Sequence, residues 1–137
     1  FELYSSAADQ GHLMALTMLG RCYENGSGTA QNLQRAVSCY QRAADADFPR
    51  GIHFLGACYE EGIGVEKDVA KGAKLYRRGA DLGDVFCRAE LAECYEFGKG
   101  LTIDLQRALT LFRQCLDDGF DGVTEGIQRV EEKLNSA

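Results

Sequence analysis

The chain has 137 residues, of which 45% are hydrophobic and 26% are charged. This composition is typical of one globular domain with a buried core. No apolar run approaches the roughly 18 residues that a membrane-spanning helix needs, so we expect no membrane insertion. The formal net charge of −6 disfavours nucleic-acid binding, because an acidic surface repels phosphates. A basic peptide or protein is the more natural partner.

One pattern of Leu, Tyr and Gly occurs three times along the chain. Its copies are LGRCYENGSGT at 19–29, LGACYEEGIGV at 55–65 and LAECYEFGKGL at 91–101, with a constant spacing of 36 residues. A fixed period between about 20 and 50 residues indicates stacked supersecondary units. We therefore expect one solenoid domain over 1–137, with complete repeats at 12–47, 48–83 and 84–119.

The two ends of the chain follow the same register. Tyr4 aligns with Tyr40 and Gly11 aligns with Gly83, so residues 1–11 are predicted to form the second helix of a truncated repeat whose first helix lies upstream. Residues 120–137 keep the apolar positions but lose the loop glycines. We expect them to form a C-terminal capping helix, apolar toward the array and charged outward.

Each repeat is predicted to contain two helices, A and B. Gly20 in the first helix A recurs as Gly56, and glycine costs about 1 kcal/mol in a helix relative to alanine, so a neighbouring helix should approach closely there. The Gly-x-Gly sequence that ends each helix A suits a left-handed cap followed by a tight turn. No strand is predicted before it, so a phosphate-binding loop is rejected. The predicted N-caps of the B helices are Asn32, Asp68 and Asp104.

Six cysteines are present, and Cys22, Cys58 and Cys94 occupy the same repeat position. Their recurrence with the apolar pattern indicates small buried residues. Cys87 and Cys115 lie at the start and the end of a predicted antiparallel helix pair and could approach one another, so their pairing stays open. No C-x-x-C motif occurs, and we predict no metal and no cofactor. Tyrosines expected in the core are Tyr23, Tyr59 and Tyr95.

The pattern Leu-Gly-x-x-Tyr-x-x-Gly-x-Gly, followed by Asp, Ala-x-x-x-Tyr and Ala-x-x-Gly, resembles the Sel1-like repeat (SLR), a relative of the tetratricopeptide repeat (TPR). The resemblance covers essentially the whole chain. It implies an all-α fold, a right-handed α/α superhelix of antiparallel helix pairs whose concave surface is formed mainly by helix A. It also implies protein binding, because members of the family serve as adaptors and scaffolds.

Two further functions stay open. The family also occurs as a C-terminal module attached to enzymes, so the chain would then dock substrates for a catalytic domain such as a kinase. The chain could also be a secreted repeat protein of the cysteine-rich branch of the family, but the positions that match the paired cysteines of that branch, such as Ala44 and Ile52, are not cysteine here. This favours the cytoplasm, a reducing compartment. The sequon at Asn25 keeps the endoplasmic-reticulum lumen as the alternative.

No catalytic residue is predicted. The two histidines are His12 and His53, and His53 has no Cys or Ser partner at local spacing. Paired acid–base chemistry needs two carboxylates in a closed pocket, which a shallow solenoid groove rarely supplies. We therefore expect the segment itself not to be an enzyme.

A protein-binding surface is predicted on helix A by matching it to the tetratricopeptide pattern, which also places Thr17 in the groove. Phe86 and Phe97 are large apolar residues on a polar face, as in many interfaces, although both could instead pack on the capping helix. The glutamate that recurs once per repeat would either accept hydrogen bonds from the glycine loop or recognise a basic ligand. The predicted binding residues are Arg21, Glu24, Arg50, His53, Glu60, Glu61, Phe86, Glu93, Glu96 and Phe97.

Overall fold

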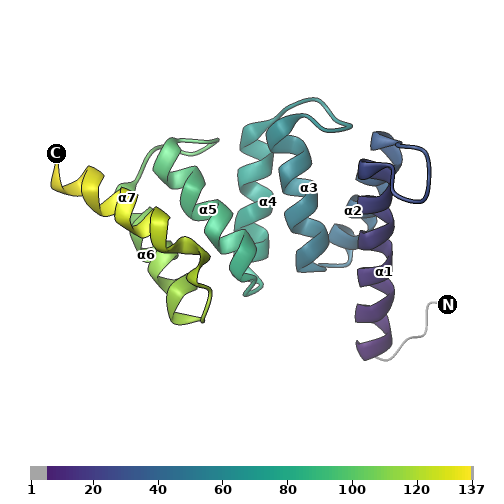
Figure 1. Ribbon diagram of the computed structural model, residues 1–137, viewed down its shortest axis with the longest axis horizontal. Coiled ribbons are helices and arrows are strands. Elements are labelled where there is room, and N and C mark those ends of the chain that lie inside the picture. The colour runs from purple at the N-terminus through teal and green to yellow at the C-terminus, as the bar shows by residue number, and fades with distance from the viewer. Residues whose placement is uncertain (1–5, 137) are drawn as a thin grey trace.

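The computed structural model describes residues 6–136, with side chains from residue 11 onward. This part of the chain forms seven α-helices packed in a row and contains no strand (Figure 1). The all-α prediction is therefore confirmed. The elements are α1 (Ser6–Asn25), α2 (Leu33–Asp45), α3 (Pro49–Glu61), α4 (Val69–Asp81), α5 (Val85–Phe97), α6 (Leu105–Asp117), the 3-10 helix η1 (Asp121–Val123) and α7 (Thr124–Asn135).

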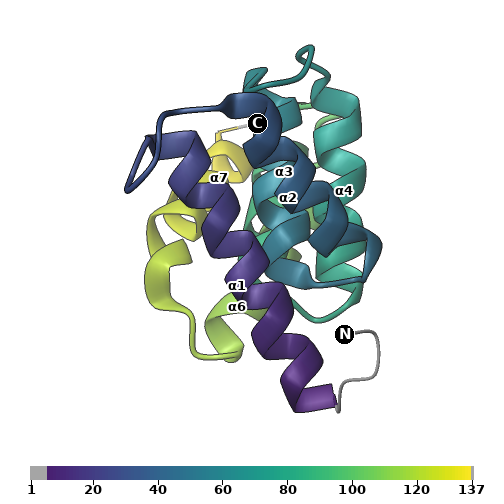
Figure 2. The same ribbon diagram turned by 90° about the vertical axis from the view of Figure 1, so that its right-hand side faces the viewer.

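The helices alternate between two layers of a solenoid. Each helix packs against the next one in the chain, and α1, α3 and α5 also contact one another in sequence. These three are the predicted A helices, and α2, α4 and α6 are the predicted B helices. The view along the row shows the pairs stacked one behind another (Figure 2). The A helices therefore form one continuous surface of the molecule.

The turns between helices are built by the residues predicted from the sequence. Gly62 and Gly98 end α3 and α5 in the left-handed conformation, with φ of 75° and 72°. The side chains of Asn32, Asp68 and Asp104 each accept a hydrogen bond from the backbone N–H three residues later, at 3.0, 3.1 and 3.0 Å. These caps satisfy N–H groups that a helix start otherwise leaves free. The predicted loop chemistry is confirmed.

Glycine within the A helices is required by a ring of the B helix in the same repeat. A Cβ added at Gly20 would lie 2.6 Å from Cε1 of Tyr40, and one at Gly56 would lie 2.7 Å from Cε1 of Tyr76. Both distances are far below ordinary carbon contacts. The expected close approach is thus confirmed, and its partner is a tyrosine ring lying on the helix A backbone.

The start of the chain differs from the prediction. The helix α1 runs unbroken from Ser6 to Asn25, so residues 6–11 continue helix A and do not form a separate second helix. Asp47 and Gly83, in the turns that follow α2 and α4, have positive φ of 58° and 91°, whereas Gly11 has no positive φ. No helix lies before α1 within the described residues. The rest of the predicted segment, residues 1–5, lies outside the described residues.

The three cysteines that share one repeat position are buried to different degrees. Cys58 and Cys94 are 1% and 2% exposed, as predicted, whereas Cys22 is only half-buried. All three occupy equivalent positions, but α1 lacks a described helix in front of it. Cys87 and Cys115 are each buried and unpaired.

Three tyrosines were predicted to lie in the core. The prediction is correct for Tyr95, which is 6% exposed, and too strong for Tyr23 and Tyr59, which are half-buried.

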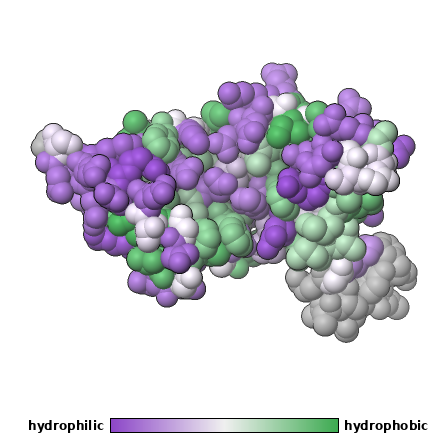
Figure 3. All heavy atoms as spheres, in the orientation of Figure 1, coloured by the Kyte–Doolittle hydropathy of each residue, from purple (hydrophilic) through white to green (hydrophobic). Residues whose placement is uncertain are grey.

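The helix α7 covers the core of the third repeat. Val130 of α7 is fully buried, and Ile127 and Leu134 pack against the same core beside it. The opposite side carries charge, and the α7 end of the molecule is mostly hydrophilic in the space-filling view (Figure 3). The predicted capping helix, apolar inside and charged outside, is what the structure shows.

Candidate protein-binding groove

The A-helix surface contains a hollow near its C-terminal end. It has a volume of about 320 Å³ and lies where α3, α5 and the segment from η1 to α7 meet. Phe86, Ala89 and Phe120 provide apolar walls, and Glu90 and Glu93 stand beside them on α5. The hollow therefore combines apolar walls with charged groups, and both kinds of group take part in recognition sites.

Aromatic rings form a row across this surface. The ring of His53 lies 5.5 Å from that of Phe54 and 6.3 Å from that of Phe86, and Phe86 makes an edge contact with Phe120 at 5.2 Å. The guanidinium of Arg50 lies 5.4 Å from the centre of the Phe86 ring. Phe86 still keeps 40% of its surface exposed. The predicted residues Arg50, His53 and Phe86 are therefore together, with an accessible ring at their centre.

His53 is held by a carboxylate of the next A helix. Its Nε2 lies 3.2 Å from Oε2 of Glu90, which orients the ring toward α5. Nδ1 of His53 is buried and has no hydrogen-bond partner within the described residues. The histidine therefore contributes a ring face and one oriented nitrogen to the groove.

Glu93 gives the groove a carboxyl group whose pKa is raised. Burial raises its pKa, and the nearby charge of Glu90 raises it further, while Lys99 and Arg129 act in the opposite direction. Its Oε1 lies 4.0 Å from Nζ of Lys99. The net effect is a pKa above the ordinary glutamate value, because the repulsion and burial outweigh the two cations.

The recurring glutamates do not form a free acidic strip. Glu24 accepts a hydrogen bond from the hydroxyl of Tyr40 at 2.7 Å, and Glu60 accepts one from Tyr76 at 2.8 Å. Nζ of Lys99 also donates to Glu60 at 3.0 Å. The partner is therefore neither the glycine loop nor a free ligand position, and both side chains are largely occupied within the protein.

Glu96 is buried, so its prediction as an exposed ligand contact is wrong. Its side chain has no accessible surface, and it accepts two hydrogen bonds from Arg129, at 2.5 and 2.7 Å, and one from Lys133 at 2.8 Å. Phe112 stands where the first two repeats have a tyrosine, so no hydroxyl is available here. Burial raises the pKa of Glu96, but the hydrogen bonds from the two cations outweigh it and hold the pKa below its ordinary value.

Phe97 lies beside this cluster and outside the hollow. The residue is 47% exposed. The cationic groups of Lys133, Arg129 and Lys99 lie 4.3, 5.2 and 5.7 Å from the centre of its ring. It is thus neither core nor a free anchor, because cations cover part of the ring.

The other predicted residues lie apart from the hollow. Arg21 stacks on Phe54 at 4.7 Å and lies 3.5 Å from Glu24. Glu61 is exposed at the end of α3. Thr17 is fully buried and donates to the carbonyl of Leu13 at 2.8 Å, so its predicted place in the groove is wrong.

Comparison with known families agrees with the geometry of the array. Residues 1–12, 13–48, 49–84 and 86–120 each match the family model described as the Sel1 repeat. The chain belongs to the Sel1 repeat family. No protein with a curated description matches it.

Solved Sel1 repeat structures superpose on most of the chain. A protective antigen of uropathogenic Escherichia coli that displays an SLR fold is 34% identical, with a TM-score of 0.75, over 82% of this chain and 24% of the antigen. A Sel1 repeat protein from Oxalobacter formigenes is 33% identical, with a TM-score of 0.71, over 82% of this chain and 46% of its own. The chain therefore spans less than half the length of either protein.

A third structure shows the fold alone. Cysteine rich protein B of Helicobacter pylori is 22% identical, with a TM-score of 0.62, over 82% of this chain and 90% of that protein. Within residues 6–136 no helix is long and apolar enough to cross a membrane. The same residues contain no group of three or more His, Cys, Asp or Glu side chains arranged to hold a metal ion.

Sequence reasoning missed three residues of this Sel1 repeat groove. Glu90 lies one helical turn after Phe86, so the spacing alone places it on the same face. Phe120 begins the predicted capping segment and has the repeat position of Phe48 and Asp84, so the return of a phenylalanine there was the available signal. Arg129 occupies the repeat position of Glu93, and the change from an acidic to a basic residue was the available signal.

Proposed function

We propose that this Sel1 repeat chain is a non-catalytic module that binds a peptide segment of a partner protein in the hollow between α3, α5 and α7. Sel1 repeat proteins are generally protein-interaction scaffolds. The observation that carries the proposal is Phe86, which is 40% exposed at the hollow, between the rings of His53 and Phe120. An exposed aromatic ring in a shaped depression is the kind of residue that dominates binding energy.

The charges around the hollow support a basic partner. Glu90 and Glu93 line it from α5 and Glu125 lines it from α7, against one arginine, Arg129. A lysine or arginine of the partner beside these carboxylates would raise the association rate and the selectivity more than the affinity. The proposed ligand is therefore a segment with one apolar side chain over Phe86 and a basic side chain next to it.

The test is selection of peptides from a random library, followed by fluorescence anisotropy with the selected peptide. Phe86→Ala should weaken binding by roughly tenfold or more. Leu116→Ala is the matched control, because Leu116 is equally exposed at 40% but lies on α6. Equal loss in both variants, or no loss in Phe86→Ala, would place binding elsewhere.

The charge part of the proposal has its own control. Glu93→Gln should weaken a basic peptide several-fold, and Glu132→Gln on the outer face of α7 should leave its affinity unchanged. Selection of mainly acidic peptides would contradict the assignment of a basic partner.

Binding should also depend on pH through Glu93. A lysine of the ligand stays charged below neutral pH, so the charge of the ligand does not change. Because the pKa of Glu93 is raised, its charge is lost at a higher pH than that of an ordinary glutamate. As the pH is lowered, affinity should therefore start to fall at pH values above the usual pKa of glutamate. Glu93→Gln should remove that early part of the decline.

For the compartment we propose the cytoplasm, with the endoplasmic-reticulum lumen as the alternative. All six cysteines are free, which suits a reducing environment. Mass spectrometry of the protein from its native source, without reductant, should show six thiols and an unmodified Asn25. A glycan at Asn25 would contradict the cytoplasmic assignment.

A further inference from the structure

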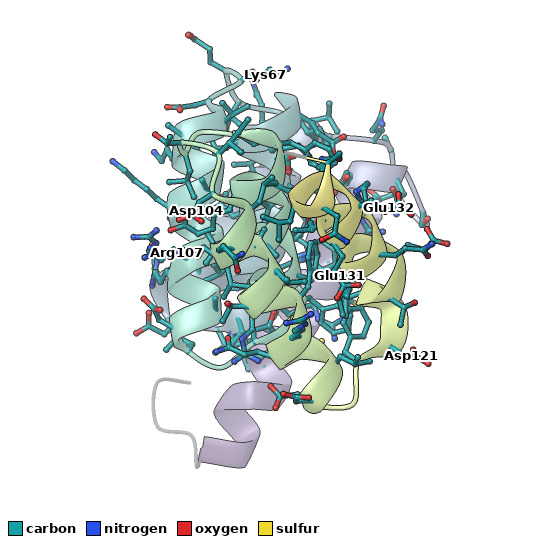
Figure 4. All side chains as sticks on the ribbon, turned by 90° about the vertical axis from the view of Figure 1, so that its left-hand side faces the viewer. Lys67, Asp104, Arg107, Asp121, Glu131 and Glu132 are labelled. Atoms are coloured by element: carbon teal, nitrogen blue, oxygen red, sulfur yellow. The ribbon has the colours of Figure 1, made fainter. Side chains whose placement is uncertain are left out.

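A second hollow lies on the B-helix side of the molecule, away from the groove described above. It has a volume of about 380 Å³ and lies between α4, α5 and α6. Two arginines line it, Arg77 from α4 and Arg107 from α6, and the apolar side chains of Leu91 and Leu111 lie beside them. Arg107 is found with Asp104 at one edge of the molecule, opposite Asp121 and Glu132 on the α7 side (Figure 4).

The hydroxyl of Tyr95 stands at the base of this hollow with an unused proton. Tyr95 is only 6% exposed. Its oxygen accepts hydrogen bonds from Nη2 of Arg77 and from Nη1 of Arg107, the latter at 3.3 Å. Because both arginines are donors, neither can take the phenolic proton, and no other described residue accepts it. Because Tyr95 lines the hollow, this proton is available to an acceptor that enters it.

The two guanidinium groups are also without a strong counter-charge. Arg77 makes no ion pair with any of the described carboxylates. The nearest one to Arg107 is Asp104, with Oδ2 at 3.9 Å from Nε, and both side chains are largely exposed, at 60% and 46%. Such a pair contributes little. Two guanidinium groups and one phenolic O–H are therefore close together, and among the described residues the only side-chain hydrogen-bond acceptor found for the two arginines is the Tyr95 oxygen itself.

We propose that this site binds the carboxylate of an acidic side chain from a partner protein, independently of the groove. A carboxylate presents two acceptor oxygens, which suit guanidinium donors and a phenolic O–H together. Asp81 also lines the hollow and Asp104 lies at its edge, so these two carboxylates balance the two arginines. A single negative charge is therefore favoured over a dianion such as phosphate. Leu91 and Leu111 would contact the aliphatic part of the bound residue.

The arrangement is particular to the third repeat. Lys71 lies 4.5 Å from the ring centre of Tyr59, but Gln41 occupies the position equivalent to Arg77. The hydroxyl of Tyr23 accepts from one arginine, Arg35, at 3.4 Å. Tyr23 and Tyr59 in the first and second repeats therefore serve as comparisons for Tyr95, because neither has two arginines beside its hydroxyl.

The test is an NMR titration of the whole chain with 4-methylpentanoate, a carboxylate with a short aliphatic tail, at fixed ionic strength. The Nε–Hε signals of Arg77 and Arg107 should shift and saturate, whereas that of Arg35 should not. The neutral 4-methylpentanamide should leave all three signals in place. A carboxylate shift that is unsaturable and shared by every arginine would overturn the proposal, as would an equal response to the amide.

Variants separate the site from a general charge effect. Arg77→Gln and Arg107→Gln should each weaken binding of the probe by roughly tenfold, and Arg35→Gln should not change it. Tyr95→Phe removes the third donor and should weaken binding about threefold or more; unchanged affinity would remove the hydroxyl from the proposal. The last titration uses inorganic phosphate. Tighter binding of phosphate than of the carboxylate would overturn the assignment of a singly charged ligand.

Discussion

Glu96 on α5 and Arg129 on α7 form a two-fold hydrogen-bonded ion pair, at 2.5 and 2.7 Å, that attaches the last helix to the third repeat. The carboxylate has no accessible surface, while the arginine side chain is 38% exposed. Removing the arginine therefore leaves a buried charge with Lys133 as its remaining cation. The loss should be large for a single ion pair.

We predict that Arg129→Ala lowers the free energy of unfolding by about 3 kcal/mol. The control is Arg113→Ala, which breaks a pair with Glu131 that is exposed on both sides, at 55% and 44%, and should cost less than about 1 kcal/mol. Urea unfolding followed by circular dichroism measures both. Similar losses in the two variants would contradict the special role of Glu96.

The stability contribution of Glu96 should disappear in acid. Its folded-state pKa is lowered, so its contribution is fully present above the pKa of an unfolded glutamate, about 4.3, and is lost as the pH falls through the folded-state value. The difference in unfolding free energy between the wild type and Glu96→Gln should be constant from pH 7 to about 5 and then shrink. A difference that grows as the pH falls would mean that the sign is wrong.

Gly79 on α4 and Cys87 on α5 should behave as a coupled pair. A Cβ at position 79 would overlap Sγ of Cys87, so Gly79→Ala should destabilise the protein by about 2 kcal/mol through overpacking. The equivalent pair one repeat earlier is Ala43 and Gly51, with the sizes reversed.

A double-mutant cycle checks this coupling. Gly79→Ala with Cys87→Gly reproduces the earlier arrangement and should recover more than half of the loss caused by Gly79→Ala. Additive losses in thermal or urea unfolding would show that the two positions do not share one space.

Thiol reactivity should follow position in the array and not position in the repeat. Burial raises the pKa of Cys58 and of Cys94 to about 12, so few thiolates form at neutral pH. Cys22 is half-buried and should react first with a maleimide or disulfide reagent. Mass spectrometry of partly labelled native protein gives the order, and labelling of Cys58 before Cys22 would contradict it.

The sequence predicted those parts of the fold that depend on local chemistry. Asp68 and Asp104 cap helices because a short carboxylate reaches the free N–H groups of its own helix start, and Gly62 and Gly98 end helices because they adopt positive φ. Neither role needs knowledge of distant residues. The close approach at Gly56 was also predictable, although the ring that causes it, Tyr76, was not identified.

The candidate site was less predictable because its contacts join residues about 30 or more positions apart. Glu96 looked like an exposed glutamate of a regular series, and its burial depends on Arg129 and Lys133 of the capping helix. One signal was present in the sequence: Phe112 replaces the tyrosine that bonds the equivalent glutamate elsewhere. The unbroken helix α1 was missed for a related reason, because a turn at Gly11 depends on packing and not on the glycine itself.

The replacement of a tyrosine by Phe112 has a consequence for how such an array can lengthen. In the first two repeats the tyrosine of helix B donates to the glutamate of helix A, so each unit supplies a hydrogen bond to that carboxylate from within its own boundaries, and Lys99 only adds a second one to Glu60. Such a unit can be copied next to itself. The unit that contains Phe112 cannot be copied in this way, since its Glu96 depends on two cations from the helix that follows it. Internal duplication of residues 48–83 should therefore give a folded, longer array, whereas duplication of residues 84–119 would leave one Glu96 facing a helix with Glu93 where Arg129 belongs. Tandem duplication is therefore expected to lengthen this array at residues 48–83 and not at residues 84–119.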